Sequence, residues 1–133
     1  MPPKLDHVGI AVKDLKEAIK LYEAVGLKVD HIEEVPSEKV RTAFIQVGEV
    51  AKIELLESTA PDGPVAKAIE KRGEGVHHVA LAVDNIEAAM EAAKRAGLVL
   101  VNDRPRPGAH GTKVNFVHPK SARGVLLELC QHE

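Results

Sequence analysis

The stretch LDHVGIAVKDLKEAIKLYEAVGLKV, from Leu5 to Val29, decides the fold, because the chain repeats it as VHHVALAVDNIEAAMEAAKRAGLVL from Val76 to Leu100. The ends of the two halves also resemble each other, with KIELLE around Glu54 and LLELCQ around Glu128. One constant offset aligns His7 with His78, Val12 with Val83, Leu15 with Ile86, Ile19 with Met90 and Gly26 with Gly97. Self-similarity of this kind indicates one supersecondary unit that the chain builds twice.

Each half predicts a strand, a helix and three further strands. Apolar and small residues alternate in the first strand, and the helix that follows has an apolar face, an Asp14 cap and Gly26 at its end. The first half predicts a strand over His7–Val12, a helix over Leu15–Val25 and strands near Val29–Val35, Arg41–Val47 and Ala51–Leu56. The second half has Asp84 and Gly97 in the capping positions and later strands near Leu98–Val101, Lys113–His118 and Val125–Gln131.

The segment Ser58–Gly75 between the halves is rich in proline and glycine and predicts a short helix over Val65–Arg72. We expect one domain over residues 1–133, with module one at 4–57, the linker helix at 58–75 and module two at 76–133. The fold class is α+β. Two tandem βαβββ modules would form one curved mixed sheet around a metal-binding cleft, with the helices outside.

Strand alternation places four polar residues on the sheet face away from the helices. Small residues flank both histidines on that face, which leaves room for a ligand. For a single residue, ordinary solvent exposure is the simpler interpretation. Two imidazoles and two carboxylates at repeat-related positions favour a divalent metal site instead. The expected ligands are His7, Glu54, His78 and Glu128.

Composition excludes several classes of protein. A formal net charge of −2 argues against a non-specific nucleic-acid binder, and 2% aromatic residues provide no platform for stacking bases. One cysteine, Cys130, suits a reducing cytoplasm and permits no internal disulfide. The N-terminus has no signal-peptide pattern, and no apolar run approaches the ~20 residues that span a bilayer. We therefore expect a cytoplasmic protein with no nucleic-acid and no membrane partner.

The chain resembles the vicinal oxygen chelate superfamily of glyoxalases, bleomycin resistance proteins and dioxygenases, and within it the methylmalonyl-CoA epimerase family. HHVALAV at 77–83 fits many members of the superfamily, whereas GAHG at 108–111 and FVHPKSARGVLLEL at 116–129 are similar to the epimerases in particular. The resemblance implies the ligand set His7, Glu54, His78 and Glu128 around a divalent ion. Co²⁺ is favoured, and Mn²⁺, Ni²⁺ or Zn²⁺ would be acceptable.

The resemblance also implies a reaction: interconversion of (R)- and (S)-methylmalonyl-CoA by α-proton abstraction and reprotonation, through a thioester enolate that the metal stabilises. Glu128 is the implied catalytic base. Some epimerases have a further acid where this chain has Thr42, so the second proton-transfer group stays open between Glu54 and a metal-bound water. The basic residues of the 104–123 region, including Arg104, Arg106, Lys113 and Lys120, are expected to bind coenzyme A phosphates.

Three alternative functions remain open. A glyoxalase I-type lyase would act on a hemithioacetal with a similar ligand set. A metal-free small-molecule binding protein of the same fold would generally lack the four ligands. A ring-cleaving dioxygenase ranks third, because a fourth protein ligand would crowd its oxygen site. We expect a homodimer, because members of the superfamily commonly form dimers and because a curved sheet has exposed edge strands that a second copy can cover.

Overall fold

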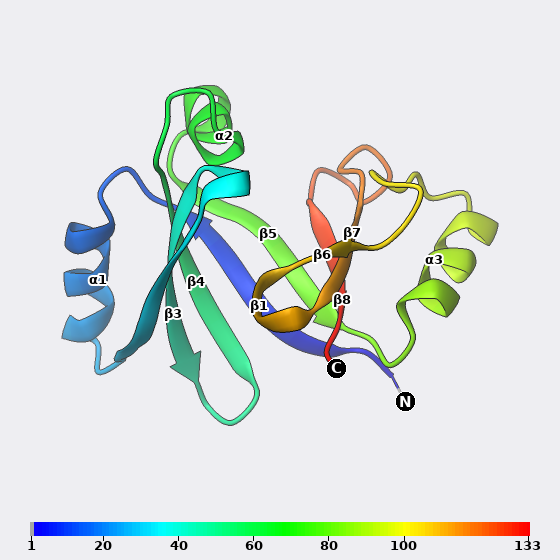
Figure 1. Cartoon of the computed structure of the whole chain (residues 1–133), viewed down its shortest axis with the longest axis horizontal. Helices are drawn as coiled ribbons and strands as arrows, with labels where there is room; N and C mark the ends of the chain where they lie inside the picture. The colour runs from blue at the N-terminus through cyan, green and yellow to red at the C-terminus, as the bar shows by residue number, and fades with distance from the viewer. Residues whose placement is uncertain (1) are drawn as a thin grey trace. The chain divides into compact units, whose positions relative to one another are not determined.

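The computed structural model describes residues 2–133 (Figure 1). The chain divides into two compact units, which we call the first unit and the second unit. The first unit is His7–His77, and the second unit joins the residues up to Asp6 to His78–Glu133. No helix in residues 2–133 is long and apolar enough to cross a membrane.

The first unit is built on four strands in the order β2-β3-β4-β1. Strand β1 runs parallel to β4, and β2, β3 and β4 are successively antiparallel. Its elements are β1 (Lys4–Ala11, of which the residues from His7 belong here), α1 (Leu15–Ala24), β2 (Val29–Val35), the short 3₁₀ helix η1 (Pro36–Glu38), β3 (Val40–Val47), β4 (Ala51–Ser58) and α2 (Pro64–Arg72).

Helix α1 forms where the sequence predicts it. The Asp14 side chain accepts the Glu17 N–H at 3.1 Å, and Gly26 follows the helix with a φ of 98°. An apolar face of α1 packs onto one face of the strands, where Leu15 and Leu55 are buried. The predicted helix, strands and linker helix of the first half are therefore confirmed to within two or three residues.

Helix α2 packs differently from α1. Its residue Val65 packs against Ala11, Val40 and Leu56. These residues alternate along their strands with the residues that α1 covers, so they lie on the opposite face of the sheet. The face of β1 and β4 that carries His7 and Glu54 is therefore covered at one end by α2.

The second unit repeats the arrangement with strands in the order β5-β8-β7-β6. Strand β5 is parallel to β8, and β6, β7 and β8 are successively antiparallel. Its elements are β5 (Gly75–Ala82, of which the residues from His78 belong here), α3 (Ile86–Arg95), β6 (Arg106–Pro107), the 3₁₀ helix η2 (Ala109–Gly111), β7 (Lys113–Val117) and β8 (Leu127–Gln131). Helix α3 packs on this sheet through Ile86, Met90 and Leu129.

Two predictions for the second half are wrong. Asn85, not Asp84, caps α3, because the Asn85 side chain accepts the Ala88 N–H at 3.0 Å. Residues Leu98–Val101 form no strand, only an isolated bridge between Leu100 and Val117.

Within Leu98–Val101, the Val101 N–H donates to the Phe116 carbonyl at 2.8 Å, whereas the Val99 N–H donates to the Ser121 Oγ at 2.9 Å. Beyond Val101, the pairing meets the side chain of Asn115, which is fully buried on β7. Its Oδ1 accepts the Asn102 N–H at 3.2 Å, and its Nδ2 donates to the Asn102 carbonyl at 2.9 Å. A side chain thus takes up backbone groups that a strand ladder would otherwise pair. The third strand of this half is the short β6 instead.

Candidate metal centre and substrate rim

In the first unit, the side chains of His7 and Glu54 meet on the face opposite α1. The His7 Nδ1 lies 3.2 Å from the Glu54 Oε2, and the two side chains are 8% and 14% exposed. In the register of the sheet, Gly9 and Phe44 flank Glu54 on the two neighbouring strands. The hydrogen at Gly9 leaves room beside the carboxylate that a larger side chain would fill.

The second unit contains the same pair. The His78 Nε2 lies 3.3 Å from the Glu128 Oε1, and each side chain is 9% exposed. Ala80 and Phe116 flank Glu128, as Gly9 and Phe44 flank Glu54. Phe116 also contacts the His78 ring edge-on, with centroids 6.2 Å apart. The duplication therefore reproduces the donors together with their neighbours.

The two pairs have the chemistry of metal ligands. Two cis ligands with bonds of about 2.1 Å to one ion would lie roughly 3.0–3.4 Å apart, and the two N–O separations, 3.2 and 3.3 Å, fit this value. Imidazole nitrogen together with carboxylate oxygen suits Co²⁺, Mn²⁺, Ni²⁺ or Zn²⁺. A buried carboxylate also requires a compensating positive charge, which a divalent cation would provide.

Thr42, the residue that replaces an acid of some epimerases, is 4% exposed and pairs with Leu56 in the register of the sheet. Phe44, two residues further along β3, pairs with Glu54. Because residues two apart share a strand face, Thr42 lies on the same face as Glu54. A hydroxyl there can hydrogen-bond, but it does not ionise near neutral pH as an acid would.

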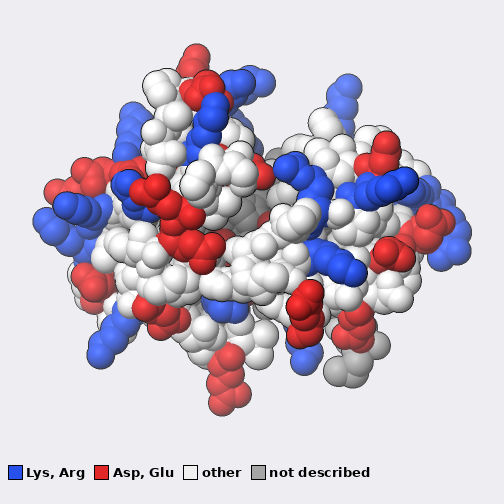
Figure 2. Space-filling view, viewed as in Figure 1, with Lys and Arg blue, Asp and Glu red and all other residues white. Residues whose placement is uncertain are grey.

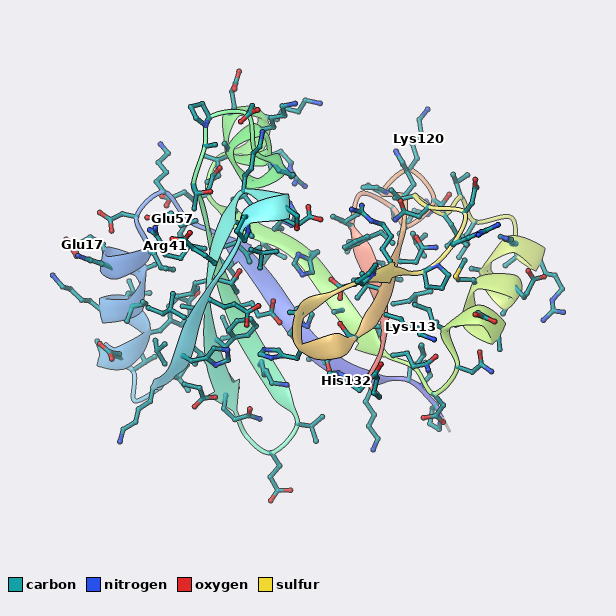
Figure 3. All side chains as sticks on the ribbon, in the orientation of Figure 1. Glu17, Arg41, Glu57, Lys113, Lys120 and His132 are labelled. Carbon is teal, nitrogen blue, oxygen red and sulfur yellow. The ribbon has the colours of Figure 1, made fainter. Side chains whose placement is uncertain are left out.

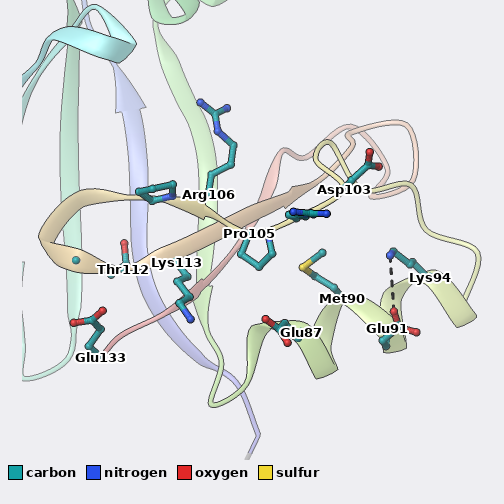
Figure 4. Close-up of a pocket in the computed structure, with 13 residues that line it drawn as sticks. Glu87, Met90, Glu91, Lys94, Asp103, Pro105, Arg106, Thr112, Lys113 and Glu133 are labelled. Atoms are coloured by element: carbon teal, nitrogen blue, oxygen red, sulfur yellow. Dashed lines mark ion pairs between the residues drawn. The ribbon is translucent and has the colours of Figure 1, made fainter.

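A pocket of about 870 Å³ opens in the second unit between α3 and the β6–β7 strands (Figure 4). Three of the expected substrate-binding residues line it: Arg104, Arg106 and Lys113. The acids Glu87, Glu91, Asp103 and Glu133 line it as well, so its charge is balanced rather than basic. Over the face shown in Figure 2, Lys and Arg side chains are likewise interspersed with Asp and Glu.

Lys120 does not join this group. It lies in the turn after β7, apart from Lys113 (Figure 3). The Lys120 N–H donates to the His118 Nδ1 at 3.1 Å, and the His118 carbonyl accepts the Ser121 N–H at 2.9 Å. His118 therefore contributes both its side chain and its carbonyl to this turn.

Three further side chains, His77, Arg41 and His31, interact with residues other than the four expected metal ligands. Burial lowers the pKa of His77, and the charge of Arg72 lowers it further. A hydrogen bond and the charge of Glu34 raise the pKa of Arg41, which also bonds Glu57 at 3.0 Å (Figure 3). His31 stacks on Phe44 with ring centroids 4.6 Å apart.

Comparison of the sequence with known proteins identifies a family and several relatives. Residues 6–116 match the family described as Glyoxalase/Bleomycin resistance protein/Dioxygenase superfamily. Uncharacterized protein YqjC of Bacillus subtilis is 42% identical over 96% of this chain and 91% of that protein. The Ethylmalonyl-CoA/methylmalonyl-CoA epimerase of Cereibacter sphaeroides is 40% identical over 96% of this chain and 97% of that protein.

A solved structure shows the same fold. Streptomyces coelicolor methylmalonyl-CoA epimerase (Q60A), in complex with 2-nitronate-propionyl-CoA, is 36% identical to this chain. The likeness covers 96% of each chain with a TM-score of 0.90. The predicted fold class of paired βαβββ modules is thereby confirmed.

Proposed function

The chain belongs to the methylmalonyl-CoA epimerase family of the Glyoxalase/Bleomycin resistance protein/Dioxygenase superfamily, and from this premise we propose that it interconverts (R)- and (S)-methylmalonyl-CoA. The observation that carries the proposal is the buried His–Glu pair, which occurs in each unit with the same small and aromatic neighbours. A solvent-facing polar sheet would not reproduce both donors and their surroundings.

We infer that His7, Glu54, His78 and Glu128 together hold one divalent ion. Support comes from the two matching N–O separations, from the burial of Glu128 and partial burial of Glu54, and from the place of the four residues in the repeat. A divalent ion held there would supply Lewis-acid stabilisation for charge that develops on the thioester oxygen. Co²⁺ is the ion that we favour.

Glu128 is the proposed base for the α-proton. A general base must accept a proton from a reacting carbon that it can reach, and a largely buried carboxylate is shielded from competing water. Glu128 is 7% exposed, with Ala80 and Phe116 as neighbours. The small Ala80 leaves space on one side, while the ring of Phe116 restricts the other.

Inversion of the α-carbon requires a second group that delivers a proton from the opposite side. Glu54 is the candidate in the first unit, because Thr42 on the same face has no carboxylate. A water molecule is the other candidate. Either assignment keeps the reaction free of net redox change, since one proton leaves and one returns.

Coenzyme A phosphates require cationic side chains. Arg104, Arg106 and Lys113 line one pocket of the second unit and remain our candidates, with Arg preferred for bidentate contacts. Lys120 remains a weaker candidate, because its turn lies apart from that pocket.

Deuterium wash-in at the α-carbon of methylmalonyl-CoA tests the proposal. We expect wild type and Glu17→Gln, which changes an exposed carboxylate on α1 outside the pocket, to exchange at equal rates, and Glu128→Gln to lose exchange by about 10²-fold or more. Unchanged exchange in Glu128→Gln would remove this residue as the base. Turnover of a hemithioacetal without epimerisation would favour the glyoxalase I-type alternative.

Metal analysis tests the remaining alternative, a metal-free binding protein. Absence of a bound ion after growth with metals, and no activity on adding Co²⁺ or Mn²⁺, would favour that alternative. The homodimer and the cytoplasmic location stay predictions, for sedimentation analysis and cell fractionation to check.

A further inference from the structure

We propose that Asp6, Cys130 and His132 form a separate site for a thiophilic divalent cation within the second unit. Nothing in the proposed epimerase chemistry requires this site, so either proposal can fail without the other. The three residues come from the start of β1, from β8 and from the segment directly after β8.

The donor atoms are close enough to share one ion. The carboxylate oxygen, the thiol sulfur and the imidazole nitrogen all lie within 4.8 Å of one another. Ligands at bond lengths of about 2.0–2.3 Å around a tetrahedral ion would be separated by roughly 3.3–3.8 Å. The His132 Nε2 and the Asp6 Oδ1 are 2.5 Å apart, so an entering ion would move them apart by less than an ångström.

The burial of the donors favours a fixed site over a chance surface cluster. Cys130 is 1% exposed and Asp6 is 7% exposed, and both lie on strands that hold their positions. The His132 side chain is 46% exposed and contacts Asp6. Such an arrangement provides three protein ligands and leaves a fourth position for water.

The donor set identifies the class of ion. Thiolate, imidazole and carboxylate together suit Zn²⁺ or Co²⁺, whereas Mg²⁺ and Ca²⁺ prefer oxygen donors alone. The ion would link the start of β1 to the end of β8 and so stabilise the second unit. It would bind with loss of the thiol proton, since the thiolate is the ligand.

The single cysteine of the chain makes the test specific. Co²⁺ bound to a thiolate gives a sulfur-to-metal charge-transfer absorption band in the near ultraviolet, and in this chain only Cys130 can produce it. We would titrate the purified protein with Co²⁺ and record this band. Cys130→Ser, Asp6→Asn and His132→Ala are the test variants.

His31→Asn is the matched control, because the side chains of His31 and His132 are each 46% exposed. A His7→Ala, His78→Ala double variant separates the band from the ligands of the proposed catalytic ion. We expect one saturating band per chain in wild type, in His31→Asn and in the double variant. Cys130→Ser should abolish it, and Asp6→Asn and His132→Ala should each weaken the affinity at least tenfold.

Three results would overturn the site. The first is no band in folded wild-type protein at saturating Co²⁺. The second is a band that neither Asp6→Asn nor His132→Ala weakens. The third is a band whose intensity per chain falls when the protein is diluted at a constant, saturating concentration of free Co²⁺, since this would show a thiolate shared between chains. Circular dichroism of each variant establishes that it is folded before titration.

Discussion

Glu57 and Gln131 make the same contact in the two units. The Glu57 Oε2 accepts the backbone N–H of Leu15 at 2.9 Å, and the Gln131 Oε1 accepts that of Ile86 at 2.8 Å. Each therefore satisfies a free N–H in the first turn of its helix. Each also lies three residues beyond a proposed metal ligand, Glu54 or Glu128, on the same strand. The strand that carries a ligand is thus bonded to the helix that covers it.

Loss of this contact should weaken the fold. We expect Glu57→Ala to lower the free energy of unfolding by about 1 kcal/mol, as other helix-capping losses do. Glu57→Gln retains an acceptor and should lose less, although it weakens the ion pair with Arg41. Urea unfolding measures both variants. Equal losses for alanine and glutamine would show that the Arg41 pair, not the cap, stabilises this end of the sheet.

The equivalent change in the second unit is Gln131→Ala. It should also lose about 1 kcal/mol, and Gln131→Glu should be tolerated, because a carboxylate accepts the Ile86 N–H equally well and is favoured at a helix N-terminus. A destabilised Gln131→Glu would contradict the equivalence of the two positions.

Metal removal should lower the melting temperature. A ligand that binds only the folded protein at 100 times its Kd adds about 2.7 kcal/mol of stability. We expect chelator-treated wild type to unfold at a lower temperature than protein supplied with Co²⁺. Because Glu54 contacts His7 within the proposed ligand set, Glu54→Ala should shrink this difference. An unchanged difference in Glu54→Ala would remove Glu54 from the ligands.

Asn115 should be intolerant of truncation. Its side chain is fully buried and bonds the N–H and the carbonyl of Asn102, so Asn115→Ala leaves both backbone groups without this partner. We expect a loss of about 2–4 kcal/mol in thermal or urea unfolding. Asn102→Ala is the control: it keeps both backbone groups, so it should lose much less. Similar losses in the two variants would contradict the argument.

Gly108 should not accept a side chain. A Cβ at this position would lie 2.6 Å from the Thr112 Oγ1 and 2.8 Å from the Val114 Cγ1. We expect Gly108→Ala to destabilise the protein by about 1–3 kcal/mol through overpacking. The double variant Gly108→Ala, Val114→Ala removes one clash and should recover part of the loss. If the double variant recovers no stability, the clash with Val114 is not the cause of the loss in Gly108→Ala.

Much of the architecture could be predicted from local pattern. Period-2 alternation placed His7 and Glu54 on the face away from α1, and cap residues located both ends of α1. The prediction failed at Leu98–Val101, where apolar residues suggested a strand. There the outcome depends on side chains distant in sequence: the Ser121 Oγ accepts the Val99 N–H, and Asn115 bonds the backbone of Asn102 just beyond the segment.

The sequence by itself determined the duplication, the fold class and the four candidate ligands. The reason is that the repeated alternation of apolar and small residues fixes which face of each strand a side chain occupies. Only the tertiary structure decided which groups meet. It paired His7 with Glu54 and His78 with Glu128, and it separated Lys120 from Lys113. It also brought Asp6 to Cys130 and His132 from opposite ends of the chain. Contacts at such separation depend on strand order and packing, which no local spacing encodes.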